Sequence, residues 1–159
     1  MKKNVMIDFE TLGTTADCVV LSLGAVTEDG DSFYVVFDSN MQQGRKISPA
    51  TLAWWEAQTP EARDVLTESR HGDCSTPEDG VKGFISWLKI VMGDDEPVVW
   101  SLGGDFDIAI INHIMSEAGI EPCWKYWNTR CLRTLGALYP QVKRPKTNNH
   151  NALDDAKNE

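Results

Sequence analysis

The sequence contains no apolar run that approaches the roughly 20 residues needed to cross a bilayer. Its first residues, Met1 to Asn4, pass directly into a strand-like pattern instead of the apolar core of a signal peptide. Four cysteines are present, but no two form a C-x-x-C pair, so neither a zinc site nor a thioredoxin-type motif is indicated. We therefore expect a cytoplasmic protein with free thiols and no membrane partner.

Basic residues are scarce, since 15 Lys and Arg stand against 24 Asp and Glu and give a net charge of −9. This balance argues against a long basic groove for duplex nucleic acid, but not against an enzyme that holds only the last nucleotides of a strand. Several basic residues do gather ahead of the C-terminus, where they form either a solvated loop or a set of phosphate contacts. They are Arg130, Arg133, Lys143, Arg144 and Lys146.

No internal repeat, low-complexity tract or long linker divides the chain, so residues 1–159 are expected to form one domain. β-forming runs predict strands at 4–8, 19–27, 32–37 and 97–101, and a short strand or loop around Trp127. Capping and periodicity signals predict helices that begin at Ser48, Thr59 and Thr76, and others at 106–118, 131–138 and 151–159. This order predicts an α/β fold in which helices flank a mixed sheet. A ribonuclease-H-like arrangement fits, although periodicity alone does not separate it from other α/β folds.

The first predicted strand ends in two carboxylates, Asp8 and Glu10. Side chains two apart on a strand point to one face, so these two converge while Phe9 turns into the core. Two buried carboxylates repel each other, and a divalent cation would remove that cost. The alternative is an acidic pair that is exposed to water at the strand end.

A second acidic pair, Asp105 and Asp107, follows a Gly103-Gly104 turn at the start of a predicted helix. The helix dipole favours acidic residues there, and this effect alone could explain both. No Gly-Lys-Ser/Thr follows the two glycines, so the turn is not a Walker loop.

The third candidate segment begins at His150. Asn151 is suited to cap the last helix, which would leave Asp154 to complete a capping box and Asp155 to face a site. His150 would lie on the loop just before the cap, although a lone histidine is more often an ordinary surface or core residue. Oxygen ligands without cysteine indicate Mg²⁺ or Mn²⁺, and two such ions can clamp the attacking and leaving oxygens of a phosphodiester. Histidine is a suitable base for the attacking water near neutral pH.

In this order, Asp8-x-Glu10, Phe106-Asp107 and His150-x-Ala152-Leu153-x-Asp155 resemble the motifs of the DEDDh (DnaQ-like) 3′→5′ exonucleases. The resemblance implies a ribonuclease-H-like fold with a central mixed five-stranded sheet. Within that superfamily, the chain is similar to small phage and prophage exonucleases and to a related bacterial exoribonuclease group. The residues that carry this narrower likeness are Trp54-Trp55, Trp100, Trp127-Asn128-x-Arg130 and Arg133-Thr134.

The resemblance also assigns roles to individual residues. It implies that Asp8, Glu10, Asp107 and Asp155 hold two ions of Mg²⁺ or Mn²⁺ and that His150 is the general base. It places Phe9 and Thr11 against the terminal nucleotide and Leu12 as a wedge against its base. Adjacent helical residues cannot share one face, so one of Trp54 and Trp55 should lie in the core; we name Trp55 as the substrate contact without excluding Trp54. Arg130 either contacts phosphate or orients a carboxylate, or else it forms a surface ion pair.

We therefore expect a metal-dependent 3′→5′ exonuclease that releases nucleoside 5′-monophosphates from a single-stranded or overhanging 3′ end. Single-stranded DNA is favoured over RNA. The alternatives are an inactive nucleic-acid-binding module on the same fold, an exoribonuclease, or an endonuclease of the ribonuclease H type. The sequence leaves open whether the protein forms a homodimer, as several relatives do. The family normally continues at least two helical turns past its last Asp, so we expect either a longer protein or a weakly held edge of the site.

Overall fold

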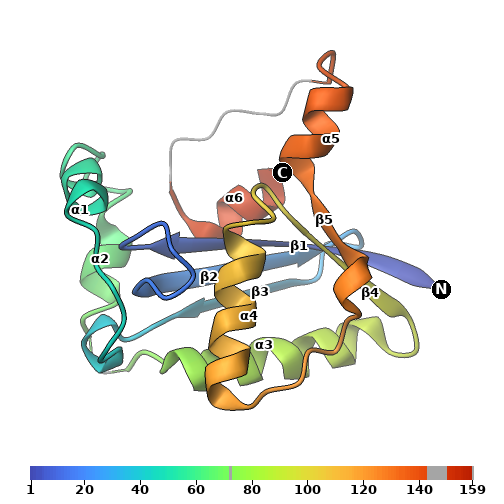
Figure 1. Ribbon diagram of the computed structural model, residues 1–159, viewed down its shortest axis with the longest axis horizontal. Helices are drawn as coiled ribbons and strands as arrows, with labels where there is room; N and C mark the ends of the chain where they lie inside the picture. Colours follow the sequence, from blue (N-terminus) through green and yellow to red (C-terminus); the bar gives the residue numbers. More distant parts are fainter. Residues whose placement is uncertain (72, 143–149, 159) are drawn as a thin grey trace.

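The computed structural model describes residues 1–71, 73–142 and 150–158. Its strands form one mixed sheet in the order β3-β2-β1-β4-β5 (Figure 1). The central strand β1 (Lys2–Thr11) pairs antiparallel with β2 (Val20–Thr27) and parallel with β4 (Glu96–Ser101). The outer strands are β3 (Ser32–Val36), antiparallel to β2, and β5 (Thr129–Cys131), parallel to β4. This arrangement confirms the predicted mixed five-stranded sheet.

The helices lie close to their predicted positions. They are α1 (Pro49–Glu56), α2 (Asp64–Glu68), α3 (Pro77–Met92), α4 (Asp107–Ala118), α5 (Leu132–Leu138) and α6 (Ala152–Asn158), with the 3-10 helices η1 (Ser39–Met41) and η2 (Tyr126–Asn128). The side chains of Ser48 and Thr76 cap α1 and α3, as predicted. The helix expected to begin at Thr59 begins later, at Asp64. The reason is that the intervening residues form turns, in which the Arg63 N–H is shared between the carbonyls of Thr59 and Pro60.

Helices α3 and α4 cover one face of the sheet, and α6 lies against the other (Figure 1). Alternate residues of β1, namely Val5, Ile7 and Phe9, point into the core beneath α3 and α4. The side chains between them therefore face α6, because neighbouring strand residues alternate between faces. Asp8 and Glu10 are among these, so the acidic end of β1 lies on the α6 face.

Gly24 of β2 allows the first turn of α6 to approach the sheet closely. A Cβ atom at this position would lie only 2.2 Å from the carbonyl carbon of Ala152. A glycine inside a strand signals such a close approach, so Gly24 is a signal for this contact in the sequence itself. The contact fixes the start of α6, and with it His150 and Asp155, over the strands that carry the other acidic residues.

Two expectations from composition can be checked on the described residues. Their helices include none that is long and apolar enough to pass through a membrane. All four cysteines are free: Cys18, Cys74, Cys123 and Cys131. Three of the five residues in the predicted basic group, Lys143, Arg144 and Lys146, lie outside the described residues, as does the last predicted helical position, Glu159.

Candidate active site

The end of β1 presents its two carboxylates as the strand period predicts. Phe9 is 3% exposed and stacks on Phe37, with ring centroids 6.2 Å apart. Glu10 lies on the opposite face at 8% exposure, directly across from Ser22 of β2. Asp8 shares that face and is half-buried. The strand pairing shifts register just after Glu10, so β1 turns away at the point where its carboxylates end.

Asp107 is the acidic residue of the second pair that reaches β1. It begins α4, is 2% exposed, and its Oδ1 accepts a hydrogen bond from the Phe9 N–H at 3.1 Å. Asp105, two residues earlier, is exposed. The Gly103 carbonyl accepts from the N–H of Asp107 at 3.2 Å, which closes the turn that delivers α4 to the strand. The helix dipole favours Asp105 and Asp107 equally, and the hydrogen bond with Phe9 of β1 is what buries Asp107 alone.

Asn151 caps α6 as predicted. Its Oδ1 accepts from the N–H groups of Leu153 and Asp154, at 3.1 and 3.2 Å. The preceding residue, His150, has a φ of 45°, which lies in the left-handed region. A residue with a Cβ pays roughly 1–2 kcal/mol for this conformation, and such strain is concentrated at functional sites. The strained backbone turns His150 back toward the acidic end of β1.

Three of the predicted site residues bring metal-binding atoms together. One ligand atom each from Glu10, His150 and Asp155 lies within 4.8 Å of the other two. Burial raises the pKa of the Glu10 carboxyl to about 8, and the charges of Asp155 and Asp107 add to the rise. Burial likewise raises the pKa of Asp107 to about 7, against the opposing effects of the Phe9 N–H and the charge of Arg133.

Both carboxyls are buried deeply enough to disfavour their ionised forms, and at Glu10 the charges of two neighbouring carboxylates add to this effect. A divalent cation bound among the carboxylates would offset the repulsion and restore their ionised form. The carboxylate oxygens are ligands that suit Mg²⁺ or Mn²⁺, and the His150 imidazole lies beside them. The residues therefore fit a divalent metal site.

The metal-free protein is expected to lose stability as the pH rises from about 5 to 8. Folded Glu10 and Asp107 keep protons that their unfolded forms, with ordinary pKa values of 4.5 and 3.8, release at lower pH. Stability falls with pH wherever the folded state binds more protons. Urea titrations in EDTA at pH 5, 6, 7 and 8 measure this slope, and Glu10→Gln should flatten it. A free energy of unfolding that is independent of pH in EDTA would contradict the assigned burial of these carboxyls.

A cavity of about 450 Å³ opens beside Glu10. It is lined by Phe9, Glu10, Thr11, Gly13, Thr14, Ser48, Ala50, Thr51, Trp54, Trp55 and Phe106. Trp54 is 43% exposed and meets the His150 ring edge-on at 4.8 Å between centroids. The cavity therefore has a carboxylate of the acidic cluster on one side and indole rings on another. This combination suits a ligand in which a polar group is attached to a flat ring.

Two of the predicted substrate contacts are buried, although Trp55 forms part of the cavity wall. Trp55 is 1% exposed, and its indole N–H donates to the Thr11 carbonyl at 2.8 Å, so its ring has no free face for a base. Leu12 is 6% exposed and packs with Leu21 and Trp55 in a second hydrophobic cluster, so it does not project as a wedge. The burial of both side chains argues against these two assignments. Trp54 has the exposure that stacking requires.

Arg130 is exposed and lies two strands away from the acidic end of β1. Its guanidinium donates to the carbonyls of Trp127 and Thr129, at 2.7 and 2.8 Å. Within the part of the chain that the structure describes, Arg130 forms no ion pair, and its guanidinium lies on backbone carbonyls instead of a carboxylate. The charge of Arg133, which the sequence offered as one of a basic group and as part of the narrower family likeness, lowers the pKa of Asp107.

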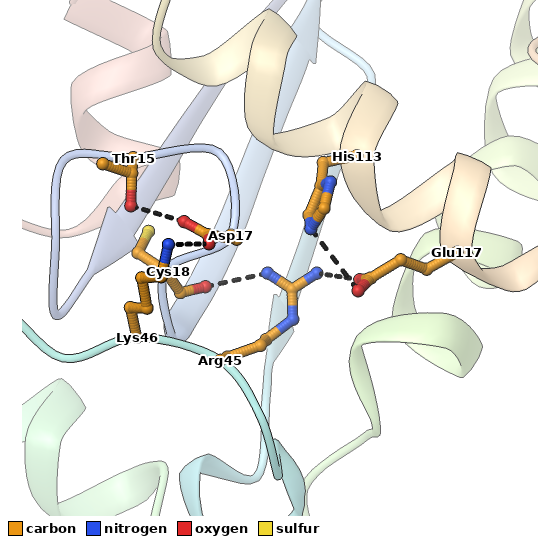
Figure 2. Close-up of polar contacts among 7 residues, drawn as sticks. All are labelled: Thr15, Asp17, Cys18, Arg45, Lys46, His113 and Glu117. Carbon is orange, nitrogen blue, oxygen red and sulfur yellow. Dashed lines mark hydrogen bonds and ion pairs between the residues drawn. The ribbon is translucent and has the colours of Figure 1, made fainter.

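Ionic contacts hold the loop after β1, part of which lines the cavity. Figure 2 shows Arg45 between this loop and α4. Its guanidinium donates to the Cys18 carbonyl and pairs with Glu117, both at 2.8 Å, and its side chain is only 8% exposed. Next to it, Lys46 pairs with Asp17 at 2.6 Å. These contacts fix one wall of the cavity against the body of the protein.

Residues 3–159 match the family described as the 3′-5′ exoribonuclease Rv2179c-like domain. The chain belongs to this family. The exodeoxyribonuclease of Enterobacteria phage T4 is 27% identical over 158 residues, which cover 81% of this chain and 68% of the phage protein. Membership in the Rv2179c-like family confirms the coarser prediction that the chain is a 3′-5′ exonuclease acting on nucleic acid.

Solved structures give the same fold. The nuclease domain of 3′hExo, a DEDDh family member bound to rAMP, aligns with a TM-score of 0.61 and 15% identity over 98% of this chain and 86% of that one. Cell-death related nuclease 4 (CRN-4) aligns with a TM-score of 0.58 and 16% identity over 98% of this chain and 60% of that one. The ribonuclease-H-like fold predicted from the motifs is thereby confirmed for this member of the Rv2179c-like family.

Proposed function

We propose that the chain removes nucleoside 5′-monophosphates from 3′ ends by a two-metal-ion mechanism, with His150 as general base. The observation that carries the proposal is the convergence of Glu10, His150 and Asp155 within 4.8 Å of one another. The buried Asp107 carboxylate adds to the same negative field. Asp8 shares the strand face of Glu10 and completes the proposed ligand set.

The carboxylates of Asp8, Glu10, Asp107 and Asp155 would hold the ions. Two divalent ions bound there would supply a nucleophile and stabilise the charge on the attacking and leaving oxygens. The His150 imidazole, which the strained backbone directs at the cluster, would accept the proton of the attacking water. The edge contact with Trp54 limits the rotation of the ring.

The cavity beside Glu10 is the proposed site for the terminal nucleoside. Its volume of about 450 Å³ is in the range of pockets that hold small ligands. Trp54 offers a base an exposed indole face, and the walls near Phe9 and Thr11 lie against the sugar. The Thr11 hydroxyl already donates to the Gly13 carbonyl at 2.6 Å, so the role of Thr11 is to shape the wall.

The proposed substrate is a single-stranded or overhanging 3′ end, with DNA favoured and RNA as the second candidate. The curated relative is an exodeoxyribonuclease, which supports DNA. The family description names an exoribonuclease, which supports RNA. Recognition of the 2′-hydroxyl decides between them, so the choice rests on an experiment.

The deciding experiment digests 5′-labelled DNA and RNA strands of one sequence, in single-stranded and overhang forms, with Mg²⁺ or Mn²⁺. A ladder that shortens by one nucleotide at a time, faster on single-stranded DNA, is the expected result. EDTA and Asp8→Ala should each abolish it. An unshortened strand together with no Mn²⁺ binding by calorimetry would favour the inactive binding module, and cleavage of circular single-stranded DNA would indicate an endonuclease.

Trp54→Ala is expected to raise KM for a single strand by roughly 5- to 100-fold, since base stacking contributes about 1–3 kcal/mol. Steady-state digestion of a labelled 8-mer measures this change, and Trp54→Phe should recover most of the affinity. Leu52→Ala is the matched control, because Leu52 lies on the same helix with 37% exposure. Equal KM values for Trp54→Ala and the wild type would exclude stacking on this ring.

A further inference from the structure

A cluster of exposed aromatic and cationic side chains lies at the β5 edge of the sheet, outside the site described above. Tyr126 is 83% exposed and Trp127 is 54% exposed, and their rings meet edge-on at 4.8 Å between centroids. The Lys125 ammonium lies 5.5 Å from the centre of the Trp127 ring. Neighbouring large aromatic side chains left exposed in this way mark an interaction surface.

Two cations of this cluster are held in place by other groups of the protein. The Lys125 ammonium pairs with Glu96 at 2.7 Å, which leaves the two arginines as the cations available to a phosphate. The carbonyls of Trp127 and Thr129 fix the Arg130 guanidinium beside the aromatic pair while leaving it exposed. Three residues further on, Arg133 lies at the other end of the segment, where its charge acts on Asp107. Two adjacent aromatic rings are therefore followed by two exposed arginines between the sheet edge and the acidic site, on a chain whose net charge is −9.

The sheet register places Arg130 on the face of the sheet that carries the active site. Trp100 of β4 pairs with both Met6 of β1 and Arg130 of β5, so Arg130 is on the face that carries Asp8. Strands are about 4.8 Å apart and rise about 3.3 Å per residue, which places Trp127 roughly 15–20 Å from Asp8. A stacked single strand rises about 3.4 Å per nucleotide and would cover this distance in about five nucleotides.

We propose that residues 125–133 form a second binding site, which holds a single-stranded nucleic acid about five nucleotides before its 3′ end. This inference rests on the proposed function, since it extends the substrate of the same site. Bases stack on Trp127 and Tyr126, while Arg130 and Arg133 contact phosphates along the path to the metals. A second copy of the chain fits less well, because a twofold interface would set the same cations against each other.

The test compares substrates of 2, 4, 8 and 12 nucleotides. Trp127→Ala should weaken binding of the 8- and 12-mers about tenfold and leave the 2-mer unchanged. Fluorescence anisotropy in an Asp8→Asn background measures affinity without digestion, and KM in the active protein should follow the same length dependence. Arg130→Gln should also reduce the salt dependence of 8-mer binding by about one phosphate contact. Ile90→Ala is the matched control, since Ile90 is 80% exposed on α3, beneath the other face of the sheet.

Three outcomes would overturn the proposal. One is an equal loss for all four lengths with Trp127→Ala, and another is no loss for any. The third is a wild-type protein that is dimeric without nucleic acid and becomes monomeric with Trp127→Ala, which would make the cluster an interface between copies. If the wild type binds the 8-mer in this length-dependent way but digests nothing, the proposed function fails while the second site stands.

Discussion

Asp107→Asn is expected to lower kcat roughly 1000-fold, since a carboxylate that holds the metal contributes several kcal/mol to the stabilisation of charge in the transition state. The fold should survive the change. Asparagine has nearly the same shape as aspartate, and its amide oxygen can still accept from the Phe9 N–H. Single-turnover digestion of a labelled 8-mer measures the rate.

The same substitution should make the metal-free protein more stable at pH 8. Asp107 is 2% exposed and its pKa is raised to about 7, so ionised Asp107 is an unfavourable buried charge until a cation neutralises it. Mn²⁺ should therefore raise the melting temperature of the wild type more than that of Asp107→Asn. The buried Asp107 carboxylate therefore lowers the stability of the metal-free protein and favours binding of the cation.

The control is Asp105→Asn, which removes a carboxylate from the same turn at an exposed position. Its rate and its response to Mn²⁺ should stay close to wild type. The assignment of Asp107 would be wrong if Asp105→Asn lost activity while Asp107→Asn kept it. Equal losses in both would indicate that the turn, instead of one carboxylate, is what matters.

His150→Gly is expected to lower kcat by roughly 10²- to 10⁴-fold, the usual contribution of a general base. Glycine adopts the observed φ of 45° without strain, so the loop before α6 should keep its path. Added imidazole should restore part of the rate. Calorimetry should show Mn²⁺ affinity within about threefold of wild type, since loss of a base, unlike loss of a ligand, leaves the carboxylates in place.

A parallel loss of Mn²⁺ affinity and rate would instead assign His150 as a metal ligand, a role that its proximity to Glu10 and Asp155 also permits. His113→Gln is the control. His113 lies on α4 beside Glu117, at 3.4 Å, next to the ionic contacts of Figure 2. Its replacement should leave both rate and metal affinity unchanged.

Local signals in the sequence located most elements correctly. The alternation along β1, the capping side chains of Ser48 and Thr76, and the Asn151 cap all depend on residues within a few positions of one another. Such signals act before distant parts of the chain meet, so they can be found without knowledge of the fold. The late start of α2 shows their limit, because a threonine and a proline also begin turns.

In two pairs of neighbouring, similar residues, contacts with distant parts of the chain decide which member is buried. Trp54 and Trp55 point to different faces of α1, and only the packing of α1 against the cluster of Leu12 and Leu21 buries the second. Asp105 and Asp107 share a turn, and only the contact with β1 buries Asp107. No local pattern separates the members of either pair, and only the likeness of Phe106-Asp107 to a family motif favoured Asp107 over Asp105.

By itself, the sequence determined the family and the identity of the acidic residues and histidine that form the candidate site, because their types and order are read directly from the chain. The tertiary structure alone decided how they meet. Pairing of β1 with β2 and the close approach at Gly24 bring residues about 140 positions apart together, and burial then shifts the pKa of Glu10 and Asp107. Proximity and desolvation are properties of the packed molecule, so no local pattern encodes them.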